Sequence, residues 1–117
     1  MMAELDRRQV GLTASGRAAL ERLTDELGWF DDAQDAARFA LSYAIRNGVP
    51  SGQAVGVVTQ WATNAFDVDS AFQALLSVTY PESTTPVRLM EHLIDEGLKL
   101  LMAEIEAGAD SPLAFFM

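Results

Sequence analysis

The chain has 117 residues, half of them hydrophobic, so it is long enough to bury the core of one domain without metal ions or disulfides. It has no cysteine, which excludes disulfides, thiolate nucleophiles and thiolate metal sites. Its 8 lysines and arginines against 17 acids give a formal charge of −9, which repels nucleic acid unless the cations gather on one face.

The first predicted element is a short strand at residues 7–13, because apolar Val10 and Leu12 alternate there with polar neighbours. A helix follows over about residues 14–27, where leucines recur at helical spacing. Gly28 lies where a helix is expected to stop, since glycine readily adopts the left-handed conformation that ends helices.

Capping residues mark where two helices begin. Thr13 or Ser15 can cap the first helix, and Asp31 or Asp32 can cap a second helix that ends at Asn47-Gly48. On the second helix, small residues recur at a spacing of four and would let another helix approach closely. These residues are Ala36, Ala40 and Ala44.

The middle of the chain is harder to interpret because glycines and a proline interrupt a stretch of β-branched residues. We expect a short strand or loop around residues 54–62. Asp67 or Asp69 can then cap a helix that closes at Tyr80-Pro81, because a proline disfavours helical geometry in the residue before it.

The last helix is the best defined in the sequence. Thr85 is its expected N-cap, Pro86 takes the first helical position, and apolar residues follow one face as far as Ile105. The tail beyond it carries apolar residues that we expect to dock on the body or on a partner. These are Leu113, Phe115 and Phe116.

The order of strand, helix, turn and helix over residues 7–48 resembles the Arc/MetJ-like ribbon-helix-helix family. In that family, the strands of two chains pair into an antiparallel ribbon that enters the major groove of DNA. The resemblance implies a mainly α fold, with residues 1–48 as a dimerisation module and residues 49–117 as an acidic, mainly helical extension packed on it. A lone strand independently needs a second strand, and a second copy is the nearest donor.

The resemblance also implies which residues contact DNA and which contact the second copy. The DNA-binding candidates are Arg7, Arg8, Gln9, Gly11 and Thr13. The dimer-interface candidates are Val10, Leu12, Ala36, Ala40 and Ala44.

Two features oppose DNA binding: Gly11 offers no side chain to a base, and acids occupy the start of the second helix, where that family holds a phosphate. These acids are Asp31, Asp32 and Asp35. The arginines near the N-terminus either face phosphate or pair with surface acids.

No motif in the sequence indicates catalysis. His92 stands beside acids on the last helix, but one histidine with carboxylates makes a poor zinc site, and a solvated helix face is the preferred interpretation. Asp67 and Asp69 lack the glycine and glutamate of a calcium loop, so we expect them to cap a helix. Serine-nucleophile and phosphate-loop frames are missing. We therefore expect no enzyme activity, no metal and no cofactor.

The sequence supports two functional hypotheses. The first is a homodimeric DNA-binding protein, a transcriptional regulator or antitoxin-like protein. The second is a protein-interaction or adaptor dimer that does not bind DNA, with a partner protein contacting the acidic C-terminal half. Short segments such as Trp29-Phe30-Asp31-Asp32 are similar to segments in a set of small uncharacterised prokaryotic proteins. With no signal-peptide pattern or long apolar run, we expect a cytoplasmic protein without membrane contact.

Overall fold

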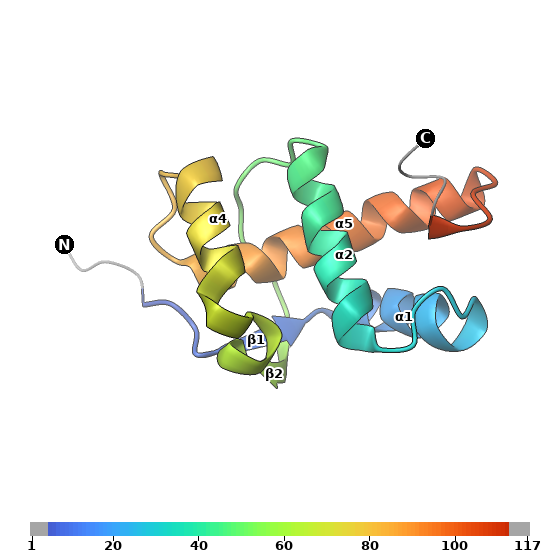
Figure 1. Cartoon of the computed structure of the whole chain (residues 1–117), viewed down its shortest axis with the longest axis horizontal. Coiled ribbons are helices and arrows are strands. Elements are labelled where there is room, and N and C mark those ends of the chain that lie inside the picture. Colours follow the sequence, from blue (N-terminus) through green and yellow to red (C-terminus); the bar gives the residue numbers. More distant parts are fainter. Residues whose placement is uncertain (1–4, 113–117) are drawn as a thin grey trace.

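Helices dominate the part of the chain that the computed structural model describes, residues 5–112 (Figure 1). The mainly α fold class is therefore confirmed. No helix within these residues is both long and apolar enough to cross a membrane. The elements in chain order are β1 (Gln9–Leu12), α1 (Ala14–Glu21), the π-helical turn η1 (Arg22–Glu26), α2 (Ala33–Arg46), β2 (Val58–Ala62), α3 (Thr63–Phe66), the 3₁₀ turn η2 (Val68–Ser70), α4 (Ala71–Thr79) and α5 (Pro86–Glu106).

The first two helices begin and end where the sequence predicts. Thr13 caps α1, since its Oγ1 accepts a hydrogen bond from the Gly16 amide at 2.9 Å. η1 continues this helix up to Gly28, which has a φ of +64° and ends the helical run. Asp32 caps α2 by accepting from the Gln34 amide at 2.8 Å.

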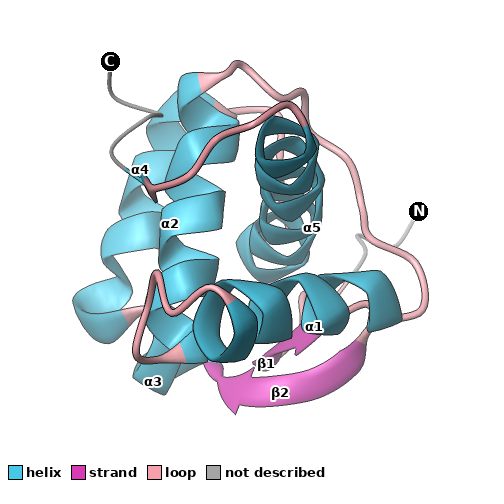
Figure 2. Cartoon of the chain, turned by 90° about the vertical axis from the view of Figure 1, so that its right-hand side faces the viewer, coloured by secondary structure: helices cyan, strands magenta, loops and turns pink. Residues whose placement is uncertain are grey.

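The long helix α5 lies at the centre of the molecule, with α1 beside its C-terminal half and α2 crossing it (Figures 1 and 2). The alanine side of α2 is fully buried in the core of this chain. Gly97 of α5 lies against Ala40 of α2, where no side chain separates the two helices. The prediction that the alanines admit another helix is confirmed, and that helix belongs to the same chain.

The strand β1 pairs antiparallel with β2 of the same chain. Val10 lies opposite Trp61 and Leu12 opposite Val58, with an irregularity in register after Val10. β1 is therefore not a lone strand, because the β-branched stretch that ends at Ala62 supplies the pairing strand that we expected from a second copy. One face of this two-stranded sheet packs on α5, where Val10 and Leu12 are buried.

Carboxylates outside the helices bind the first turns of α4 and α5. Asp67 accepts from the Phe72 amide at 2.7 Å and the Gln73 amide at 3.1 Å, so its predicted capping role is confirmed. Thr85 is the N-cap residue of α5 and Pro86 its first residue, as predicted, but the Thr85 side chain makes no capping hydrogen bond. Asp6 holds the first turn of α5 instead, accepting from the amides of Val87 at 2.8 Å and Arg88 at 3.0 Å. The expected docking of the C-terminal tail concerns residues outside the described range.

Candidate functional site

The predicted DNA-contact residues do not form one exposed face. Arg7 Nε lies 2.7 Å from Glu91 Oε2 in an ion pair, and only 25% of the arginine side chain is exposed. Gly11 is buried, and its amide donates to the same Glu91 oxygen at 2.6 Å. These contacts turn two of the predicted contact residues toward α5.

Thr13, Arg8 and Gln9 complete the predicted set. Thr13 is engaged twice, since it caps α1 and donates from Oγ1 to Asp95 Oδ1 at 2.6 Å. Arg8 and Gln9 are exposed, and the Arg8 carbonyl accepts from Thr63 Oγ1 at 2.7 Å. Of the five residues that the sequence suggested for DNA contact, two adjacent ones thus keep exposed side chains.

The five predicted dimer-interface residues are buried inside a single chain. Each has 4% or less of its surface exposed. A residue must expose surface to contact a partner, so these residues form the core between β1, α2 and α5 in this fold. The interpretation of these residues as a dimer interface is corrected accordingly. They are Val10, Leu12, Ala36, Ala40 and Ala44.

Two buried carboxylates on α5 hold the N-terminal segment, and the sequence reasoning missed them. Glu91, which is only 3% exposed, accepts hydrogen bonds from Arg7 Nε and from the Gly11 amide. Asp95 accepts a hydrogen bond from Thr13 Oγ1. Burial raises the pKa of Glu91, while the Gly11 hydrogen bond and the Arg7 charge oppose that rise. One signal was present: Glu91 stands three residues before Ile94 and seven before Leu98, on the apolar face.

The helix face around His92 is not the solvated face that the sequence suggested. Its neighbours Glu91 and Asp95 are buried, and the histidine itself is half-buried. His92 Nε2 lies 3.1 Å from the Pro50 carbonyl, to which it can donate, and Gly52 lies over the ring. The described residues hold no cluster of three metal-binding side chains. His92 therefore fastens the segment after α2 onto α5.

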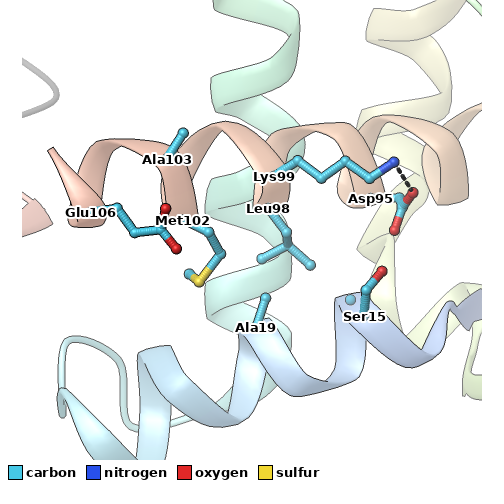
Figure 3. Close-up of a pocket in the computed structure, with 9 residues that line it drawn as sticks. Ser15, Ala19, Asp95, Leu98, Lys99, Met102, Ala103 and Glu106 are labelled. Carbon is cyan, nitrogen blue, oxygen red and sulfur yellow. Dashed lines mark ion pairs between the residues drawn. The ribbon is translucent and has the colours of Figure 1, made fainter.

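A groove of about 260 Å³ runs between α1 and α5 (Figure 3). Its floor is mostly apolar, with Ala19, Leu98 and Met102 between the two helices. At one end Lys99 Nζ lies 3.2 Å from Asp95 Oδ2, and this hydrogen bond and charge raise the pKa of Lys99. Because Asp95 is bonded to both Thr13 and Lys99, it is not placed as a free acid or base.

The most unusual surface lies on α4, at the end of the molecule where α5 begins (Figure 1). The inner side of this helix packs on the body: Leu76 is buried, and so is Tyr80, whose hydroxyl donates to the Val49 carbonyl. The outer side is also apolar and is exposed. We call its four residues, which are spaced i, i+3, i+4 and i+7, the α4 face. They are Ala71, Ala74, Leu75 and Val78.

The charge pattern around α4 sets it apart from the rest of an acidic chain. No charged residue occurs between Ser70 and Pro81, although the formal charge of the chain is −9. Val78 is 80% exposed and Leu75 is 45% exposed. Val68, just before the helix, is exposed as well. An exposed apolar patch of this kind is typical of a contact surface.

Comparisons of the chain with protein-family models, with curated proteins and with solved structures gave no match.

Proposed function

We propose that the chain is a non-enzymatic protein-interaction module whose contact surface is the α4 face. One observation carries the proposal: α4 is apolar on both sides, yet only one side packs on the body. An apolar helix face is normally covered, because exposing apolar surface to water costs free energy. A second protein surface supplies the missing cover.

The contacts of the N-terminal residues favour this function over DNA binding. The Arg7 guanidinium is committed to Glu91, and the buried Gly11 cannot meet a base edge. Phosphate binding needs several free cations on one face, whereas this chain has more than twice as many acids as cations. The adaptor hypothesis is therefore the one that the geometry supports best.

Two adjacent leucines provide the test of this proposal. Leu75 belongs to the α4 face, and Leu76 is 1% exposed in the core. In urea unfolding at low protein concentration, Leu75→Gln should change the free energy of unfolding by less than about 0.5 kcal/mol. The matched variant Leu76→Gln should lose at least about 2 kcal/mol, because it removes buried apolar contacts.

The proposal fails if both variants are destabilised to a similar extent. Leu75 would then contribute to the stability of the folded monomer, and the α4 face would not be available to bind another protein.

A further inference from the structure

The polar side chains that flank the α4 face already have hydrogen-bond partners within the helix. Ser77 and Thr79 border it, and their hydroxyls donate back into the helix, to the Ala74 carbonyl at 2.7 Å and the Leu75 carbonyl at 2.9 Å. Covering these flanks leaves neither hydroxyl donor without an acceptor. The usual penalty for desolvating polar groups is therefore small at this face.

The small residues of the face permit a close helix contact. Ala71 and Ala74 place only methyl groups between their backbone and a partner, while Leu75 and Val78 provide larger apolar side chains. The chain already uses this principle internally, where Gly97 of α5 lies against Ala40 of α2. A second helix with the same alternation of small and large residues fits best.

The absence of charge identifies the partner surface. A basic partner would be recognised through carboxylates and an acidic one through cations, and the α4 face has neither. Two copies of a chain with a charge of −9 repel each other over most of their surface, so they can meet closely only where charge is missing. The chain itself carries the uncharged, small-and-large helix face that matches.

We infer that the α4 face binds the α4 face of a second copy, with the two helices antiparallel about a twofold axis near Ala74 and Leu75. This inference rests on the proposed function and names its partner. Around a twofold axis, residue i of one copy contacts residue j of the other, and residue j of the first copy contacts residue i of the second. Such a contact needs no charged groups to be symmetric. Ala71 of one copy then lies opposite Val78 of the other.

The contact is small, so the dimer is weak. A helix of nine residues is about 14 Å long, and one such face per copy puts the interface at the low end of specific interfaces, below about 1,200 Å² in total. We expect a reversible equilibrium that is visible only when the protein concentration is raised.

Sedimentation velocity of the full chain tests the dimer. Between about 1 µM and 500 µM, the weight-average mass should rise from 12.7 kDa toward twice that value. Val78→Asp should abolish the rise, since it places an unpaired carboxylate against the apolar Ala71 end of the other copy's α4 face. The matched control is Val55→Asp: Val55 is 88% exposed and lies outside α4, so this variant should still dimerise.

Cysteine substitutions test the antiparallel arrangement, because the natural chain has no cysteine to interfere. Under mild oxidation, a mixture of Ala71→Cys and Val78→Cys chains should form mixed disulfides faster than Val78→Cys chains form disulfides with each other. Faster pairing of Val78→Cys with itself would overturn the antiparallel arrangement.

Different results contradict the dimer and the proposed function. If the mass stays at 12.7 kDa throughout while Leu75→Gln leaves stability unchanged, the second copy is the wrong partner and the proposed function stands. If Leu75→Gln destabilises the monomer as Leu76→Gln does, the proposed function fails as well.

Discussion

Gly97 of α5 lies so close to Ala40 of α2 that a Cβ atom at residue 97 would be 2.0 Å from the Ala40 carbonyl oxygen. That oxygen is helix backbone and cannot move aside without disturbing α2. The two residues therefore fix the distance between the helices that form the centre of the core.

The Gly97→Ala variant should be strongly destabilised. The added methyl group meets backbone, so overpacking costs at least about 2 kcal/mol and exceeds the gain of about 1 kcal/mol from better helix propensity. Urea unfolding followed by circular dichroism measures the change. Glu104→Ala, on the exposed side of the same helix, is the control and should have little effect. A stable Gly97→Ala variant would contradict the close contact.

Replacing Asp6, which caps α5 from a distant part of the chain, should lower the stability more than replacing Thr85, the residue just before this helix. Asp6 accepts hydrogen bonds from two amides in the first turn, so Asp6→Ala should lose about 1 kcal/mol of stability. Thr85→Ala should lose less, because Thr85 makes no capping bond. Thermal unfolding of both variants ranks them, and the reverse order would show that Thr85 is the working cap.

The stability difference between the natural chain and Glu91→Gln should depend on pH. Burial raises the folded-state pKa of Glu91, so the unfolded chain releases this proton first as pH rises. The stability that protonated Glu91 contributes is thus full below its ordinary pKa and is lost as pH rises through the folded value. Urea unfolding of both proteins from about pH 4 to pH 7 should show the variant gaining relative to the natural chain. The opposite slope would mean that Arg7 and Gly11 lower the pKa instead.

Duplex DNA should not bind with the steep salt dependence of a ribbon that uses arginines. Arg7 is paired with Glu91, and the acidic chain repels phosphate. Fluorescence anisotropy of a labelled duplex in about 50 mM salt should stay flat as protein is added. Binding that weakens steeply with salt and is lost in Arg8→Ala would restore the DNA hypothesis, since Arg8 is exposed.

Local patterns were sufficient to predict most elements. Thr13 and Asp32 cap the helices they were expected to cap, Gly28 ends the first, and Tyr80-Pro81 closes α4. These signals act over one or two turns of chain, so the sequence around each residue already contains the physics that decides it.

Contacts between distant residues could not be predicted in the same way. The sequence shows Glu91 beside His92 among other acids, which is the pattern of a solvated face. Only the fold brings Arg7 and Gly11 to Glu91, from 84 and 80 positions away. For the same reason the pairing of β1 with β2 was not predicted, since periodicity identifies a strand but not its partner.

The sequence by itself determined a mainly helical, acidic chain, where most of its helices begin and end, and that its alanine-rich helix admits a close neighbour. The tertiary structure decided which neighbour that is, that β1 pairs with β2, and that the N-terminal residues are bonded to α5. It also decided that one side of the uncharged helix α4 is covered and the other exposed. The physical reason is that the hydrophobic effect favours burial of apolar residues but has no direction. Only the packed chain therefore shows which apolar surfaces are buried and against which neighbours.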